Sequence, residues 1–342
     1  MSEMTVCGIG AVSPAGWNVE ALRCVLVNRD PLRITPVKRP GWCEPLEVRT
    51  VPAPAVRPVF LSHSRFRRTS PISQFAVAAG IEALGNDLPK IQAGEMSLGI
   101  VVSVLSACVN FSRRFYDETW RNPATASPLV FPETVFNAPS SHIAAWLGTE
   151  AINYTIVGDQ GMFLVALAIA ADWLEQERVQ ACLVIGAEES DWITADAFRL
   201  FARRAILSEG AGAIYLKRDG SNPIAILSSI TDAHAFLQDR GKLAAVQAMR
   251  AQLPPFCAAH LLCDSRIGLD HYDAPEQRAW DDWSGEKLSP KTLLGEGLAA
   301  SSAWQCVSAI DRLQNGRYTA ASISVVGCNQ QAIGAHFVRP TL

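Results

Sequence analysis

Short apolar runs and amphipathic segments alternate along most of the chain. The runs at 97–105 and 181–186 are almost wholly apolar, which is typical of strands that are covered on both faces. Segments such as 73–84 and 138–147 have helical spacing of their apolar residues. Strands that alternate with helices predict a layered α/β fold.

The same order of elements occurs twice. The first half closes on a strand within 205–217, and the second half has strands at 223–230 and 258–264 and a final pair at 322–327 and 334–338. Helices are expected between these strands at 242–253, 275–283 and 298–315. The pattern predicts two similar halves, residues 1–217 and 222–342, without a repeat in the sequence itself.

Two segments depart from this alternation. Residues 161–174 are so apolar that we expect a helix buried on all sides. Residues 31–58 are rich in proline, which disfavours both a regular helix and a central strand, so we expect a long surface loop.

Composition narrows the class of protein. The chain has 342 residues, of which 49% are hydrophobic, and a formal net charge of -3, which argues against disorder and against a nucleic-acid-binding protein. The first residues lack the basic start and long apolar stretch of a signal peptide, and the apolar run at 161–171 stops at Asp172, too short to cross a bilayer. Cysteine and histidine show no metal-ligand spacing. We therefore expect a cytoplasmic protein without a metal site.

Several segments together resemble the β-ketoacyl synthases of the thiolase superfamily. They are VCGIGAVSPAGWNVEAL at 6–22, SPISQFAVAAGIEAL at 70–84, SPLVFPETVFNAPSSHIAAWLG at 127–148 and LSEGAGAIYL at 207–216. The resemblance implies a thiolase-like fold, in which two pseudo-duplicated halves form a five-layer αβαβα sandwich. It further implies that 131–141 and the strand at 151–157 form a dimer interface.

The resemblance also locates the catalytic positions, and these are degenerate. Members of the family have a cysteine just before the buried helix, where this chain has IVGDQGMFLVAL and places Gln160, or Gly158 if the alignment shifts by two residues. Neither residue has a nucleophilic atom. Asp159 beside this position would disfavour a thiolate as well.

Both catalytic histidines of the family are replaced too. An alignment on Gly268, Asp273 and Glu276 puts Ser265 at the first histidine position, with His271 displaced into a nearby loop. The second histidine normally follows a lysine by five residues, and here Glu296 follows Lys291. We expect the Glu296 carboxylate to be held by Lys291, Arg266 or the Gln160 amide, because an unpaired buried carboxylate is costly. The glycine-rich turn that gates the family's pocket is altered as well, to GCNQQAIG at 327–334.

These losses favour a non-catalytic subunit similar to a chain-length factor. Such a subunit pairs with an active ketosynthase in fatty acid, polyketide or aryl polyene biosynthesis, and its substrates are acyl chains on the phosphopantetheine of an acyl carrier protein, with no cofactor of its own. The alternatives are a glutamine-type malonyl-thioester decarboxylase, an acyltransferase that uses Cys108, Cys263 or Ser265 as nucleophile, and a homodimeric scaffold.

The proline-rich region suggests where an acidic partner binds. Between residues 33 and 68 the only carboxylates are Glu44 and Glu47, against eight basic residues: Arg33, Lys38, Arg39, Arg49, Arg57, Arg65, Arg67 and Arg68. Clustered positive charge speeds the encounter with an acidic protein such as an acyl carrier protein. The competing interpretation is a solvated loop whose arginines tie it to the body of the protein.

Overall fold

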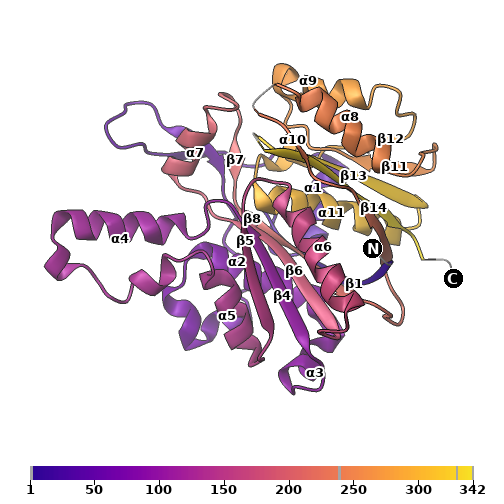
Figure 1. Ribbon diagram of the computed structural model, residues 1–342. Helices are drawn as coiled ribbons and strands as arrows, with labels where there is room; N and C mark the ends of the chain where they lie inside the picture. Colours follow the sequence, from indigo (N-terminus) through magenta and orange to yellow (C-terminus); the bar gives the residue numbers. More distant parts are fainter. Residues whose placement is uncertain (1–2, 238–239, 329, 341–342) are drawn as a thin grey trace.

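The computed structural model describes residues 3–237, 240–328 and 330–340. Its centre is a large mixed sheet in the order β12-β11-β13-β14-β9-β1-β8-β6-β4-β5 (Figure 1). The strands of the first part are β1 Met4–Val12, β4 Leu98–Val104, β5 Ile152–Val157, β6 Ala181–Glu188 and β8 Gly210–Lys217. Those of the second part are β9 Ala225–Ile230, β11 His260–Cys263, β12 Glu286–Leu288, β13 Ala320–Val326 and β14 Gln331–Val338, with β10 His234–Ala235 beside β14.

The two parts of this sheet have the same pattern of pairing. From β1 outward, two antiparallel pairs, β1 with β8 and β8 with β6, are followed by two parallel pairs that lead to β5. From β9 outward, two antiparallel pairs, β9 with β14 and β14 with β13, are followed by two parallel pairs, β13 with β11 and β11 with β12. The parts join where β1 pairs with β9 over Met4 to Val6. The assignment of 1–217 and 222–342 to separate halves remains a prediction that is compatible with this order.

Helices form layers around the strands (Figure 1). Between the two parts lie α6 Met162–Glu175 and α11 Ala299–Gln314, which contact each other and strands of the sheet. Outside them lie α2 Pro71–Leu84 and α5 Ala138–Leu147 on one face and α8 Lys242–Gln252 and α9 Asp270–Ala279 on the other. The order helix, strands, buried helices, strands, helix is the predicted five-layer sandwich, and α6 confirms the buried helix expected at 161–174.

Close contact between α2 and β1 requires glycine on the strand. A Cβ at Gly8 would lie 2.0 Å from the Ala83 carbonyl oxygen, and one at Gly10 would lie 2.0 Å from that of Ala79. Because any side chain there would push the helix off the sheet, these glycines set the separation of the two layers.

Two expectations from the sequence are wrong in detail. The proline-rich region is not a plain loop, because β2 Thr35–Val37 and β3 Leu46–Arg49 form a small sheet with β7 Leu207–Ser208, in which β3 is the middle strand. The helix expected from Pro275 begins at Asp270 instead and contains Pro275, so His271 lies exposed in its first turn. Pro275 is the sixth residue of this helix, so it lies inside the helix, where it lacks the amide hydrogen of a regular helical bond, and its position did not mark the helix start.

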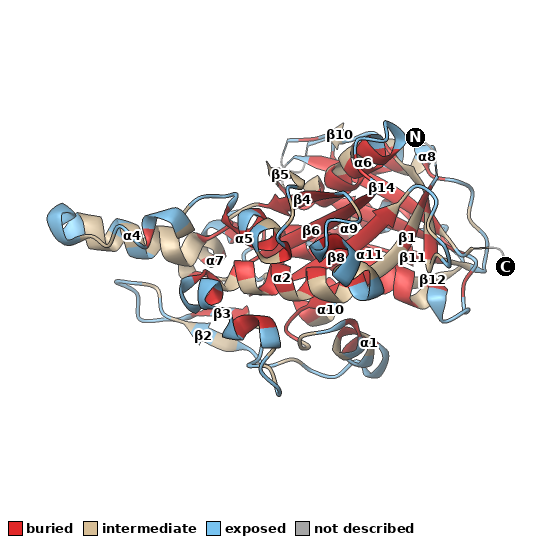
Figure 2. Ribbon diagram, turned by 90° about the horizontal axis from the view of Figure 1, so that it is seen from below, coloured by how far each residue is buried: buried red, intermediate tan, exposed pale blue. Residues whose placement is uncertain are grey.

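The remaining elements are short or peripheral. They are α1 Val19–Asn28, η1 Val59–Ser62, η2 Ser64–Arg68, η3 Gly85–Asp87, α3 Leu88–Gln92, α4 Val109–Arg121, η4 Pro123–Thr125, η5 Phe131–Glu133, α7 Trp192–Phe198 and α10 Lys291–Leu294. Helix α4 projects from the body as an arm without buried residues (Figure 2). None of the helices in the described ranges has the length and apolar character needed to cross a membrane.

Candidate functional site

Gln160 precedes Gly161, the N-cap residue of α6, and is wholly buried. Its side-chain oxygen Oε1 accepts a hydrogen bond from the Cys328 amide at 3.1 Å, and its backbone carbonyl accepts one from the Ser302 hydroxyl of α11. The amide nitrogen Nε2 has no hydrogen-bond partner among the described residues. Gln160 thus ties the start of α6 to α11 and to the loop after β13, and it offers no nucleophile.

Asp159 beside it is buried with one carboxylate oxygen, Oδ2, unpaired among the residues that the structure describes. Burial raises the pKa of Asp159 to about 6, against the lowering effect of hydrogen bonds from backbone amides such as that of Gly161. A Cβ at Gly327 would lie 1.7 Å from Oδ2, so glycine at this position makes room for the carboxylate. A negative charge here opposes the formation of any neighbouring thiolate.

Ser265 follows β11 and is also buried. Its hydroxyl donates to the Ser324 carbonyl oxygen and accepts from the Val326 amide, both at 2.8 Å, so it continues the pairing of β11 with β13 by side-chain bonds. The proton and a lone pair of Oγ are both engaged by the backbone, and among the described residues no side-chain base is hydrogen-bonded to Ser265, as an active serine requires.

Glu276 of α9 holds Ser265 in place through the serine's backbone amide. Both of its carboxylate oxygens lie 3.1 Å from the Ser265 amide nitrogen, and the Ser324 hydroxyl also donates to one of them. Burial, together with the charge of Asp264, raises the pKa of the Glu276 carboxyl. The sequence pattern did not reveal this supporting role, although a carboxylate on the buried side of a helix is a signal for it.

Lys291 and Glu296 are both almost inaccessible to solvent and form an ion pair, with Lys291 Nζ 2.9 Å from Glu296 Oε2. The other oxygen, Oε1, accepts from the Leu298 amide at 2.7 Å, just before α11. This confirms the expectation that a cation holds Glu296. Arg266 instead pairs with Asp264 and donates to Ser289.

The fold brings the predicted positions to one place. Gln160 is bonded to Ser302 of α11, Glu296 to the residue that precedes α11, and Ser265 to the end of β13. Cys328 joins them, because its amide bonds Gln160. That these positions correspond to the family's catalytic residues stays a prediction from the alignment.

Thiols near or proposed for this site are poor nucleophiles. Burial raises the pKa of Cys328 to about 12, with added effects of the Asp159 and Glu296 charges. Burial likewise raises the pKa values of Cys108 and Cys263 far above the usual range. Within the described ranges, no imidazole is hydrogen-bonded to any of these thiols; His142 binds Glu133, and His336 binds Ser322.

Solved structures with the same arrangement of elements identify the fold. The chain superimposes on a chain of the ishigamide ketosynthase/chain length factor with a TM-score of 0.79 and 19% identity over all of both chains. The chain has the ketosynthase fold. It also matches a β-ketoacyl synthase from Burkholderia phymatum, with a TM-score of 0.79 and 14% identity over all of both chains.

A third similar structure contains two kinds of subunit. It is a ketosynthase in complex with its chain length factor from Xenorhabdus doucetiae, with a TM-score of 0.78, 13% identity, and coverage of 99% of this chain and 98% of that one. No protein-family model and no curated protein matches the sequence. At these identities the ketosynthase fold is retained while most side chains differ.

Proposed function

We propose that this protein is a chain-length-factor-type partner subunit of an active β-ketoacyl synthase and does not catalyse condensation itself. The observation that carries the proposal is the state of Gln160, Ser265 and Glu296. Each is buried and engaged in bonds that hold the fold, whereas a condensing centre needs a thiolate with imidazoles beside it.

An exposed apolar surface supports the pairing with another subunit. Strand β5 lies at one edge of the sheet, and its Tyr154 and Val157 are about half exposed. The segment around α4 and η5 adds further exposed apolar side chains: Tyr116, Trp120, Leu129, Phe131, Val135 and Phe136. A free strand edge beside apolar side chains favours association with a second sheet edge. We call β5 and these side chains the pairing surface.

The basic region offers a second surface, for an acyl carrier protein. Arg65, Arg67 and Arg68 of η2 are exposed and have no ion pair within the described ranges. Other members of the group serve the fold instead, since Arg39 pairs with Asp196 and Arg57 donates to the Leu61 carbonyl. The proposal places carrier-protein docking at η2, where three neighbouring arginines without ion pairs can attract an acidic partner.

The test separates a partner subunit from an independent enzyme. The purified chain is incubated with malonyl and acyl carrier-protein thioesters, alone and with a ketosynthase of the same pathway. We expect no release of CO2 by the chain alone, a stable complex with the ketosynthase, and condensation only by that complex. Release of CO2 by the chain alone that disappears in Gln160→Ala would overturn the proposal in favour of a glutamine-type decarboxylase.

A separate variant tests whether the carrier protein binds at η2. Reversal of charge in Arg65→Glu/Arg67→Glu/Arg68→Glu should weaken carrier-protein binding to the assembled complex and reduce its dependence on salt. The matched control, Arg203→Glu/Arg204→Glu, changes two adjacent exposed arginines after α7, outside η2 and the pairing surface. Binding that is unchanged at low and moderate salt would leave η2 without this role.

A further inference from the structure

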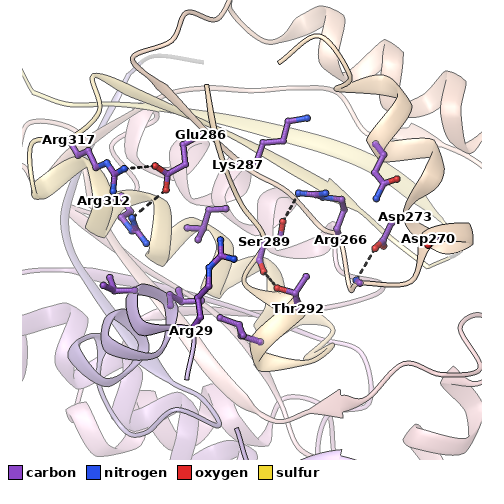
Figure 3. A pocket seen from close by; sticks show the side chains of 16 residues that line it. Arg29, Arg266, Asp270, Asp273, Glu286, Lys287, Ser289, Thr292, Arg312 and Arg317 are labelled. Carbon is purple, nitrogen blue, oxygen red and sulfur yellow. Dashed lines mark hydrogen bonds and ion pairs between the residues drawn. The ribbon is translucent and has the colours of Figure 1, made fainter. Parts of the chain in front are cut away.

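A cavity of about 470 Å³ lies between α1, the β12–α10 segment and the loop after β11 (Figure 3). None of Gln160, Ser265, Glu296 and Lys291 lines it, so it is separate from the degenerate site. Its volume is within the range of sites for small molecules.

Guanidinium groups dominate the lining. Arg29 comes from the end of α1, Arg266 from the loop after β11, and Arg312 and Arg317 from α11 and the turn after it (Figure 3). The neighbouring Lys287 also lines the cavity, but its ammonium donates to the Trp280 carbonyl and points away. Burial lowers the pKa of Lys287, and the charge of Arg266 lowers it further, against the raising effect of Asp264, Asp281 and Asp282.

Two of the three carboxylates that line the cavity already have partners. Asp273 accepts hydrogen bonds from the amides of Ile267, Gly268 and Leu269. Glu286 binds Arg317 at 2.8 Å and accepts from the Tyr318 hydroxyl. The remaining lining carboxylate, Asp270, is exposed at the rim of the loop. The guanidinium groups of the cavity therefore have more N–H donors than the lining carboxylates can accept from.

Arg312 is the arginine of this cavity whose donors are least satisfied by the protein. Its side chain is only 14% exposed, yet its nearest carboxylate oxygen, on Glu286, is 3.7 Å from Nη1, and no hydrogen bond joins its guanidinium to a described residue. A guanidinium has five donors in a fixed fork that matches the oxygens of a phosphate. A partly buried guanidinium whose one recorded partner is a carboxylate oxygen at 3.7 Å keeps donors for a further anion.

Arg29 adds a further guanidinium to the cavity. It ends α1 in the left-handed conformation, with φ at 57°, where glycine or asparagine is the usual residue. The side chain is exposed and has no ion pair within the described ranges. Leu26 and Val27 of α1 and Leu293 of α10 give the same cavity an apolar wall.

We propose that this cavity binds a small molecule that carries two or more phosphate groups. Arg29 and Arg312 bind the phosphates, Arg266 contributes its free guanidinium nitrogen, and the wall of Leu26, Val27 and Leu293 contacts an organic part. The site is independent of the proposed function, because it uses neither the pairing surface nor η2.

The test measures binding of inorganic pyrophosphate and of ADP to the full chain by calorimetry and by the shift in melting temperature. We expect saturable binding of one ligand per chain. In Arg312→Gln and Arg29→Gln the affinity should fall roughly tenfold to a hundredfold, as expected for the loss of a charged hydrogen bond. Tighter binding of ADP than of pyrophosphate identifies an organic diphosphate as the ligand class, and equal binding identifies the diphosphate group alone.

Two controls keep the result interpretable. Arg218→Gln removes the same charge at a surface position beyond β8, where Arg218 pairs with Glu177, and should leave the affinity unchanged. Arg312→Lys keeps the charge but loses the fork and should still bind more weakly than the wild type. The absence of binding at millimolar ligand, or an equal loss in Arg218→Gln, overturns the proposal.

Discussion

Lys291 and Glu296 form an ion pair from which water is excluded, with side chains 1% and 0% exposed and 2.9 Å between Nζ and Oε2. The five-residue spacing spans α10 and the following Gly295, whose φ of 87° turns the chain back so that the two side chains meet. Lys291 is therefore the counter-ion of a buried carboxylate.

Removal of one member of this pair should be more costly than removal of both. Lys291→Met leaves the Glu296 carboxylate buried and unpaired, and we expect it to lower the free energy of unfolding by about 3–5 kcal/mol. Lys291→Met/Glu296→Gln should recover most of that loss. As a control, Arg114→Met breaks an exposed pair with Glu118 and should have little effect on stability. Urea denaturation checks all three, and equal losses in the single and double variants would contradict the prediction.

Asp159→Asn should stabilise the protein above neutral pH. The pKa of Asp159 is raised to about 6 by burial, from an ordinary 3.8, so the folded state binds this proton more tightly than the unfolded state does. The resulting loss of stability is absent below about pH 4 and complete above about pH 6. Asparagine carries no charge, so we expect a gain of about 1–3 kcal/mol at pH 8 and little at pH 4.

The measurement is urea denaturation at both pH values. Asp219→Asn, which changes an exposed carboxylate, serves as the control and should have little effect at either pH. A gain in Asp159→Asn that is the same at pH 4 and pH 8 would show that charge is not its cause.

His336 should make the protein sensitive to mild acid. Burial lowers its pKa to about 4, with a further effect of His260, whose ring centroid is 6.0 Å away. The unfolded chain binds the proton near pH 6.5 and the folded chain only near 4, so stability is lost as the pH falls between these values. A shift of this size corresponds to about 3 kcal/mol.

His336→Gln should remove much of this dependence. We expect its free energy of unfolding to fall less than that of the wild type between pH 7 and pH 4, measured by urea denaturation. His271→Gln changes an exposed histidine and should keep the wild-type dependence. Parallel curves for wild type and His336→Gln would contradict the assignment to His336.

Ser265→Ala should affect stability without affecting chemistry. It removes the hydroxyl that bridges the Ser324 carbonyl and the Val326 amide, so we expect a loss of about 1–3 kcal/mol. The wild-type chain, incubated with acyl thioesters, should show no added mass by mass spectrometry. An acyl adduct that is present in the wild type and absent in Ser265→Ala would instead identify Ser265 as a nucleophile.

The pairing surface should be required for association. Phe131→Asp/Phe136→Asp places charge among exposed apolar side chains, and we expect it to yield monomers, measured by light scattering. Val56→Asp changes a side chain that is equally apolar and 84% exposed, but outside that surface, and should leave the assembly intact. Wild-type protein that is already a dilute, stable monomer without any partner would count against the pairing surface.

By itself, the sequence determined the class of fold and most of its elements. The sequences that form β4, β6 and α6 are long, uniformly apolar runs. Such runs can be recognised from the local spacing of apolar residues alone. The resemblance to ketosynthases added the order of layers and the positions of Gln160, Ser265, Lys291 and Glu296. It also pointed to a cation for Glu296, because a buried carboxylate requires a partner wherever it lies.

Tertiary structure decided which contacts those residues make. Lys291 rather than Arg266 reaches Glu296, because Arg266 is held by Asp264 and Ser289. The small sheet of β2, β3 and β7 escaped the sequence pattern, since β7 lies over 150 residues from β3 and supplies its parallel partner. The arginine cavity is likewise made from α1, β12 and α11, and charges so distant in sequence converge only when the layers pack.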